Sequence, residues 1–280
     1  EIAAINMVYG AAAAGVRVMT SSSSPGISLM MEGISYIACA ELPCVIVNIM
    51  RGGPGLGNIA PSQADYFQAV KGGGHGDYRL LVLAPASVQE VLDLVGLAFD
   101  LADKYRNPVM VVGDGILGQM MEAVEFKDKE DILDMSKEWA TTGHGMKRDN
   151  NMITSIYIKP EVLESHNRKL QDKYRVIEEN EVRVEAFNCD GADVIVAAFG
   201  TVARIIKNVI KTAEKEGIKV GLIRPVTLWP FPVKTFEQYA GVPKAFLTVE
   251  LNMGQMVEDI RLAVNGTRPV YFHGRTGGML

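Results

Sequence analysis

Apolar and polar positions follow two different periods along the first 125 residues of the chain. Short runs of mostly apolar, often β-branched residues predict buried strands, which lie at 16–20, 45–50, 80–83 and 109–112. Between these runs apolar residues recur every three or four positions, which predicts helices over 2–14 and after Ser24, Ser62 and Ser87. Strands and helices that alternate in this way form a parallel sheet with helices on both faces.

Polar residues predict where two of these helices begin. Ser24 is expected as the N-cap of its helix, because Pro25 follows in a position typical of the first turn. Ser87 and Glu90 have the spacing of a capping box, in which each side chain satisfies a backbone amide.

The pattern changes after residue 125 and resumes near residue 191. Half of the residues at 166–185 are charged, with both signs mixed, which predicts a solvated helix rather than an acidic or basic interaction tail. Strands are then expected again at 193–199, 220–223, 246–249 and 270–272, with helices at 202–216 and 254–264 and a rigid Pro-rich connection at 228–232. We therefore expect an α/β domain over 1–125, a connecting segment over 126–190 and a smaller α/β domain over 191–280.

Composition narrows the function classes. The 28 basic and 33 acidic residues give a net charge of −5 without a basic stripe, which argues against a nucleic-acid partner. The chain has 3 cysteines, too few and too scattered for a disulfide framework or a four-cysteine metal site, which indicates a reducing, cytoplasmic location. No apolar run reaches the roughly 18 residues that a membrane helix needs.

A glycine-rich loop follows the strand at 45–50 and carries a single cation, Arg51. Ligands of open α/β sheets bind at the carboxyl ends of such strands, and an arginine there suits a carboxylate or a phosphate. The alternative is a structural ion pair with a nearby carboxylate. Gly52, Gly53 and Gly55 favour the ligand, because they leave little side-chain bulk beside the guanidinium.

A serine-rich loop, Thr20–Gly26, joins the preceding strand to its helix. Free amides, hydroxyls and the helix dipole make such a turn suitable for an anion, although an ordinary serine-rich turn has the same composition. The proximity expected between this loop and Arg51 favours the first interpretation. His75, in another glycine-rich stretch, either faces the same site or is a solvated loop histidine.

These residues together resemble a known family. Glu1–Gly10, the serines before Pro25 and the run from Arg51 to Gln63 are similar to the 2-oxoacid:ferredoxin oxidoreductases, in the alpha-type subunit that carries their pyrimidine-binding domain. The glycine-rich run is most similar to that of the branched-chain, 2-ketoisovalerate members. Further on, Gly200-Thr201, Pro230–Pro232 and Glu250–Gln255 resemble the family's transketolase-C-terminal-like domain.

The resemblance implies a parallel-sheet, thiamine-diphosphate pyrimidine-type domain followed by a smaller transketolase-C-terminal-like α/β domain. It implies oxidative decarboxylation of a 2-oxoacid to an acyl-CoA, with electrons passed to ferredoxin. Glu1 would be catalytic and would bind the cofactor's aminopyrimidine ring, together with Ser22, Ser23 and Ser24. Arg51 would be catalytic and would bind the substrate carboxylate, with Gly52, Gly53 and Asn58 beside it.

The chain departs from a complete enzyme. Three scattered cysteines cannot hold an Fe–S cluster. Gly113-Asp114-Gly115 has the form of a Mg²⁺–diphosphate motif, but Asn150 and Asn151 come too late to complete it, so we interpret it as a turn and expect no metal site. The family's Tyr-Pro-Ile-Thr-Pro segment is missing, so we expect the first domain to lack its N-terminal part.

Thiamine diphosphate is therefore expected to be shared with a partner subunit of the same complex that binds its diphosphate. Mg²⁺ and the Fe–S clusters would lie on partner subunits, with CoA as co-substrate and ferredoxin as electron acceptor. We expect a dimer of the alpha-type chain and no membrane association. The alternatives are a 2-oxoglutarate or pyruvate member of the family, and a non-catalytic scaffolding paralogue.

Overall fold

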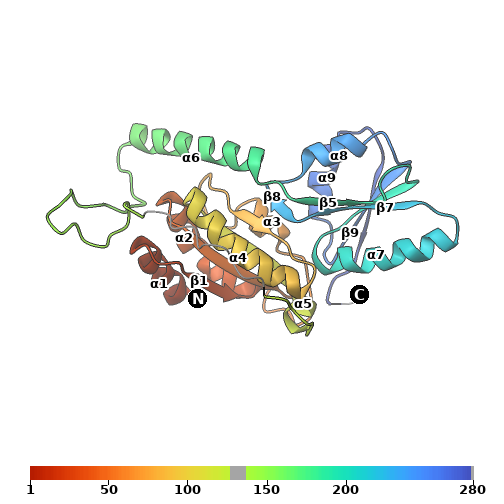
Figure 1. Cartoon of the computed structure of the whole chain (residues 1–280), viewed down its shortest axis with the longest axis horizontal. Helices are drawn as coiled ribbons and strands as arrows, with labels where there is room; N and C mark the ends of the chain where they lie inside the picture. The colour runs from red at the N-terminus through yellow and green to blue at the C-terminus, as the bar shows by residue number, and fades with distance from the viewer. Residues whose placement is uncertain (127–136, 279–280) are drawn as a thin grey trace.

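The computed structural model describes residues 1–126 and 137–278. It contains two five-stranded sheets that lie in opposite halves of an elongated molecule (Figure 1). Each sheet is parallel except for one edge strand. The expected α/β class, with a parallel sheet followed by a smaller α/β unit, is confirmed.

The first sheet has the order β1-β2-β4-β3-β8. Its strands are β1 (Met19–Ser22), β2 (Cys44–Met50), β3 (Leu81–Leu83), β4 (Pro108–Asp114) and β8 (Thr227–Trp229). The central strands β2 and β4 are almost wholly buried, because helices cover both faces of a parallel sheet. The helices of this half are α1 (Ile2–Ala13), α2 (Ser24–Cys39), α3 (Tyr66–Val70), α4 (Val88–Tyr105), α5 (Gly115–Gln119) and α6 (Pro160–Asn180).

The second sheet has the order β10-β9-β6-β7-β5. Its strands are β5 (Val184–Phe187), β6 (Val194–Ala197), β7 (Val220–Pro225), β9 (Ala245–Glu250) and β10 (Val270–Gly274). In the view of Figure 1, α7 (Gly200–Lys215) lies below the sheet, and α8 (Val233–Tyr239) and α9 (Met256–Val264) lie above it. One hydrophobic cluster continues from the first sheet into the second.

The predicted helices and strands are confirmed, with limits that shift by a few residues. Four elements were not predicted: α5, β5, β8 and α8. The stretch 228–232, expected as a rigid connection, overlaps β8, and α8 follows it. The charged stretch is confirmed as the helix α6, whose buried residues are Leu170, Tyr174 and Ile177. The expected connecting segment 126–190 lies partly outside the described residues, at 127–136, and also contains β5.

Three local predictions need correction. Ser24 is the first residue of α2 and not its N-cap; Ser23 holds that position and makes no capping hydrogen bond. The Gly113–Gly115 triplet is not a turn: it ends β4, and Asp114 caps α5 by accepting from the amides of Ile116 and Leu117. Ser87 does cap α4, but the Glu90 carboxylate accepts from the amide of Ala86 and not from that of Ser87.

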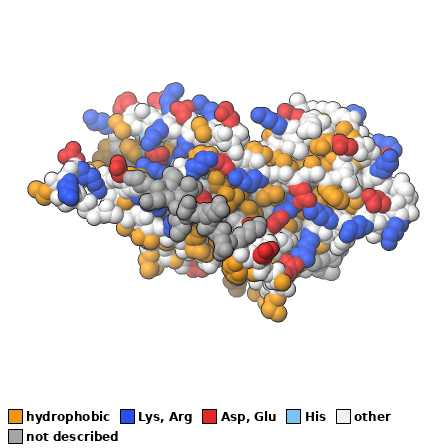
Figure 2. Space-filling view, viewed as in Figure 1, with side chains coloured by type: hydrophobic (Ala, Val, Ile, Leu, Met, Phe, Trp, Pro, Cys, Tyr) orange, Lys and Arg blue, Asp and Glu red, His pale blue; other side chains and the backbone are white. Residues whose placement is uncertain are grey.

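The surface seen in Figure 2 carries Lys and Arg interspersed with Asp and Glu, so that face has no large patch of one sign. Among residues 1–126 and 137–278, no helix combines the length and the apolar character needed to cross a membrane.

Candidate functional site

The carboxyl ends of three strands meet at one edge of the first sheet. β1 pairs with β2 so that Ser22 lies beside Asn48, and β2 pairs with β4 so that Met50 lies beside Asp114. Ligands of open α/β sheets bind at this edge. The serine-rich loop and the glycine-rich loop meet there, because the amide of Arg51 donates to Ser24 Oγ at 3.1 Å.

Arg51 forms no ion pair with any carboxylate in the described part of the chain. Its Nη2 makes one long hydrogen bond, 3.4 Å, to the carbonyl oxygen of Leu56, and its Nε is buried without a partner. A partly buried guanidinium with so few acceptors is costly unless an anion completes its shell. The alternative of a structural ion pair therefore has no support among the described residues.

The glycine-rich loop is folded on itself, and hydrogen bonds of the Asn58 side chain help to hold this conformation. Asn58 Oδ1 accepts from the amide of Ala60 at 3.0 Å, and Nδ2 donates to the carbonyl oxygen of Gly277 at 3.2 Å. A Cβ at Gly52 would lie 2.4 Å from Asn58 Oδ1, whereas one at Gly53 would meet nothing within 4 Å. Gly52 therefore makes room for the Asn58 side chain, and Gly53 leaves the loop surface open. Their expected contacts with a substrate remain predictions.

Glu1 lies over the first turn of α2. Ser22 Oγ donates to Glu1 Oε1 at 3.1 Å, which fixes one carboxylate oxygen. A Cβ at Gly26 would lie 2.6 Å from that oxygen and 2.0 Å from Ser22 Oγ, so only glycine leaves room for this arrangement. The second carboxylate oxygen makes no hydrogen bond with the described residues.

A polar network behind the two loops was not predicted. Asp65 Oδ2 accepts from Ser24 Oγ at 2.6 Å and from Asn48 Nδ2 at 2.9 Å. Asn48 is fully buried, and its Oδ1 has no partner. The network holds the serine-rich loop against the end of β2. Its signal in the sequence is the one polar residue in the otherwise apolar run at 45–50.

A cavity of about 270 Å³ opens at this edge, between β2 and α5. Its polar side chains are those of Ser23, Arg51 and Gln119, and its apolar ones are those of Ile49, Met50 and Ile59. In the part of the chain that the structure describes, the cavity thus has an arginine without a counter-ion next to apolar side chains.

His75 does not lie at this edge. Its carbonyl oxygen accepts from Ser35 Oγ at 2.7 Å, and its ring packs edge-on against Tyr36. Both partners belong to the last turns of α2, whereas Ser24 begins that helix. The structure therefore separates His75 from the serine-rich loop.

The two halves of the molecule are joined directly behind the glycine-rich loop. Gln63 donates from Nε2 to the carbonyl oxygen of Phe199 at 2.9 Å, and its Oε1 accepts from the amide of Leu251 at 3.1 Å. Asp114 also accepts from the hydroxyl of Thr201, at the start of α7. These contacts attach the strand-end edge of the first sheet to the second half.

Glu250 organises the second half at this junction. Its carboxylate accepts from the amides of Met256 and Val257 in the first turn of α9 and from Asn252 Nδ2. Burial raises the pKa of Glu250, and these hydrogen bonds oppose the rise. Asn252 in turn donates to the carbonyl oxygen of Gln63 at 2.8 Å.

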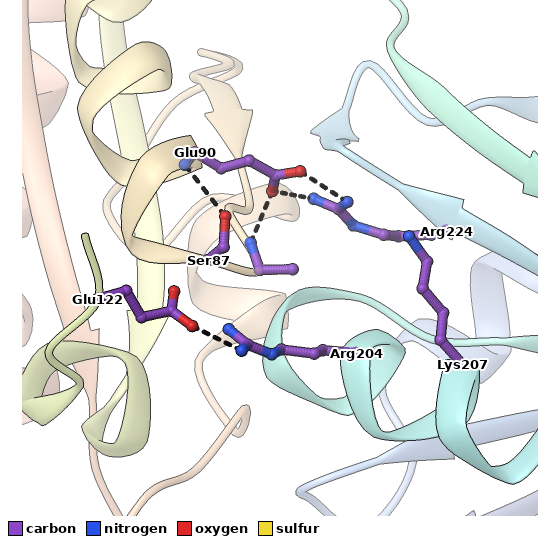
Figure 3. A pocket seen from close by; sticks show the side chains of 7 residues that line it. Ser87, Glu90, Glu122, Arg204, Lys207 and Arg224 are labelled. Atoms are coloured by element: carbon purple, nitrogen blue, oxygen red, sulfur yellow. Dashed lines mark hydrogen bonds and ion pairs between the residues drawn. The ribbon is translucent and has the colours of Figure 1, made fainter. Parts of the chain in front are cut away.

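A second pocket lies between the halves and is lined by ion pairs (Figure 3). Arg224, almost fully buried, is paired with Glu90, and Arg204 is paired with Glu122. Lys207 is paired with Glu185 of β5. Because each of these cations has a carboxylate partner, the pocket works as a structural junction and offers no free charge to a ligand.

The geometry of residues 1–126 and 137–278 thus presents an arginine without an ion pair, a fixed carboxylate and an open glycine surface at one strand-end edge. The family model described as "Pyruvate flavodoxin/ferredoxin oxidoreductase, thiamine diP-bdg" matches residues 1–186. The chain belongs to the 2-oxoacid:ferredoxin oxidoreductase family. A second model of this family, "Pyruvate:ferredoxin oxidoreductase core domain II", matches residues 192–280.

Curated relatives of this oxidoreductase family match the chain along its length. Ketoisovalerate oxidoreductase subunit VorB of Methanothermobacter thermautotrophicus is 54% identical over 280 residues, covering 100% of this chain and 79% of that protein. 2-Oxoglutarate synthase subunit KorA of Methanothermobacter marburgensis is 34% identical over 305 residues, covering 99% of this chain and 81% of that protein.

Solved structures agree with the fold. The 2-oxoglutarate:ferredoxin oxidoreductase from Magnetococcus marinus, with 2-oxoglutarate, coenzyme A and succinyl-CoA bound, matches with a TM-score of 0.80 and 25% identity. The match covers 99% of this chain and 53% of that one, so this chain spans about half the length of that oxidoreductase. A split-gene transketolase in an inactive β4 tetramer shares the fold, with a TM-score of 0.61, 15% identity and coverage of 98% of this chain and 72% of that one.

Proposed function

We propose that this chain is the pyrimidine-binding subunit of an oxidoreductase that converts a branched-chain 2-oxoacid, CoA and oxidised ferredoxin to an acyl-CoA, CO₂ and reduced ferredoxin. The observation that carries the proposal is Arg51, a cation at a strand-end edge that has no carboxylate partner among the described residues. The 54% identity to a ketoisovalerate oxidoreductase subunit supports the branched-chain substrate over 2-oxoglutarate, whose synthase subunit is 34% identical.

Arg51 would bind the substrate carboxylate and so hold the keto carbon in position, which converts an encounter into a unimolecular step. Gly53 and the open loop surface would allow the approach, while Asn58 keeps the loop in shape. Ser23 lies in the same cavity and would contribute its hydroxyl.

The residues at Glu1 fit the aminopyrimidine ring of thiamine diphosphate. The Glu1 carboxylate is fixed through one oxygen by Ser22, above a space that Gly26 leaves open. Its other oxygen is available for a hydrogen bond to the ring. When bound, the cofactor supplies a carbon nucleophile for the keto group. Ser24 would act indirectly, through its bonds to Asp65 and to the amide of Arg51.

The remaining parts of the reaction would come from other polypeptides. Among the described residues, no group of three or more His, Cys, Asp or Glu side chains could hold a metal ion. We assign Mg²⁺, the cofactor's diphosphate and the Fe–S clusters to partner subunits of a cytoplasmic complex that contains a dimer of this chain. The domain limits 1–125, 126–190 and 191–280 remain part of this proposal.

The test is Arg51→Ala in the complex assembled with its partner subunits. Loss of a charge-assisted contact to the substrate is expected to lower kcat/KM for 2-ketoisovalerate by about 10² to 10³, since such contacts contribute about 2 to 5 kcal/mol. Arg175→Ala is the matched control, because Arg175 lies on the exposed face of α6, where its ion pair among the described residues is with Asp172.

The assay measures 2-ketoisovalerate- and CoA-dependent reduction of ferredoxin, with gel filtration as a check on assembly. Unchanged kcat/KM in assembled Arg51→Ala would reject the role of Arg51. A complex that assembles but turns over no 2-oxoacid would favour a scaffolding paralogue.

A further inference from the structure

We propose that the cavity between β2 and α5 binds the branched alkyl group of the 2-oxoacid and selects for it; this inference rests on the proposed function. The cavity has Arg51 at one end and an apolar surface next to it. A branched 2-oxoacid has the same order of groups, a carboxylate followed by a compact hydrocarbon. The cavity volume, about 270 Å³, is just below the roughly 300 to 1,000 Å³ of sites for drug-sized molecules, as a smaller ligand requires.

The apolar surface comes from one strand and one loop. Ile49 and Met50 end β2, and Met50 is almost fully buried, so it forms a fixed floor. Ile59 leaves the glycine-rich loop and is 82% exposed. An alkyl group in this cavity would cover part of the Ile59 side chain and so remove apolar surface from water.

Helix α5 forms the opposite wall with glycines. A Cβ at Gly118 would lie 3.0 Å from Ile49 Cγ2, closer than ordinary van der Waals contact. A Cβ at Gly115 would lie 3.4 Å from the carbonyl oxygen of Ile59. The absence of side chains at these two positions therefore sets the width of the cavity between α5 and β2.

The charges of the lining distinguish between 2-oxoacids. Arg51 is the one charged side chain among the described residues that line the cavity. Once Arg51 binds the first carboxylate, the described lining offers the second carboxylate of 2-oxoglutarate only the neutral side chains of Ser23 and Gln119 and no second cation. Burying an unpaired charge is costly, so the cavity disfavours that acid.

Two variants test the inference in the assembled complex. Ile59→Ser removes apolar contact at an exposed position, and Gly118→Val places a side chain in the cavity from α5. Each is expected to lower kcat/KM for 2-ketoisovalerate about tenfold or more and to change kcat/KM for pyruvate less than threefold, since one methylene in a pocket contributes about 10- to 200-fold. For Ile59→Ser the loss should appear mainly in KM, because the contact positions the substrate without joining the reaction.

The controls match the variants in chemistry and exposure. Ile158→Ser changes an isoleucine that is 89% exposed and does not line the cavity. Gly241→Val changes a glycine whose Cβ would meet nothing within 4 Å. Both controls should leave the ratio of the two kcat/KM values unchanged.

The outcomes separate this inference from the proposed function. Equal losses for both acids, or no loss with Ile59→Ser, would overturn the alkyl site while the proposed function stands. An unmodified complex without 2-oxoacid-dependent turnover would overturn the proposed function and the alkyl site together.

Discussion

Single residues at the strand-end edge are held by few contacts, and the contacts leave specific atoms free. Arg51 is placed by its backbone, through the bond to Ser24 Oγ, while its guanidinium makes one long hydrogen bond within the described part of the chain. Glu1 is placed by Ser22 through one oxygen. In both cases these contacts orient the side chain but leave some of its hydrogen-bonding atoms without a partner among the described residues. A ligand can therefore form bonds there without breaking strong internal ones.

Glu1→Gln tests this orientation at the level of one atom. Glutamine keeps a carbonyl oxygen as the acceptor for Ser22, but it replaces the free carboxylate oxygen by an uncharged NH₂ group, which donates. We expect the assembled complex to lose at least about 10² in kcat, in the range of general acid–base effects, with subunit assembly unchanged. The measurement is single-turnover decarboxylation together with gel filtration. Retained turnover would reject the proposed role of Glu1 in activating the cofactor.

At the scale of elements, the glycine-rich loop and the loop that follows it have separate tasks. The first part exposes Gly53, and the second part enters the interior at Gln63, which is 1% exposed. Gln63 bonds to the start of α7 and to the end of β9. Glu250 supports the same junction by holding the first turn of α9. The candidate site is therefore positioned by the second half as well as by the first sheet.

Gln63→Ala is expected to destabilise the protein by about 2 to 3 kcal/mol. The substitution leaves the carbonyl oxygen of Phe199 and the amide of Leu251 without their side-chain partner, and unsatisfied buried groups carry this cost. Urea unfolding measures the change in the free energy of unfolding. Gln171→Ala is the control, since Gln171 makes a single bond to the carbonyl oxygen of Asp77 at the surface of α6. Equal stability of the two variants would contradict the junction described here.

At the scale of the whole molecule, the first sheet takes its edge strand β8 from a segment that lies between two strands of the second sheet. β8 follows β7 of the second sheet, yet it pairs antiparallel with β3 at the edge of the first sheet, where Val82 lies beside Trp229. β5 comes before β6 in the chain and forms the edge of the second sheet next to β7. The chain therefore passes between the halves more than once, and neither sheet is completed by one continuous segment.

A protein shortened to residues 1–190 is expected to aggregate. Without β8, the edge of β3 is unpaired, and Leu81, Val82 and Leu83, which are at most 1% exposed in the whole chain, would reach the surface. Size-exclusion chromatography of the 1–190 and 1–280 chains at equal concentration measures this difference. A monomeric 1–190 chain with cooperative unfolding would contradict the expectation.

Much of the fold could be predicted because each predicted strand or helix buries a continuous apolar pattern. β2 and α4 are examples, with a β-branched run in one and a helical stripe with a Ser87 cap in the other. β8 and α8 were missed because Pro230 and Pro232 lie between them, and prolines normally argue against regular structure. β8 is an edge strand, where the pairing comes from a distant segment and has no local signal.

The candidate site was predictable where sequence neighbours carry it and not where distant segments meet. Arg51 and its glycines lie in one run, and the meeting with the serine-rich loop follows from parallel strands. The bonds of Asp65 to Ser24 and Asn48 depend on side-chain geometry, which periodicity does not contain. The cavity between β2 and α5 depends on the width that Gly118 leaves, and that appears only in three dimensions.

One consequence follows from the loop that begins at Arg51 and ends at Gln63. Its first residue carries the guanidinium, its last residue is bonded to the second half, and Asn58 in its middle is bonded to Gly277 near the other end of the chain. A rotation of the second half relative to the first would therefore move this loop and, with it, the Arg51 guanidinium. A partner subunit that docks on the far half of the molecule would then shift the Arg51 guanidinium without contacting it.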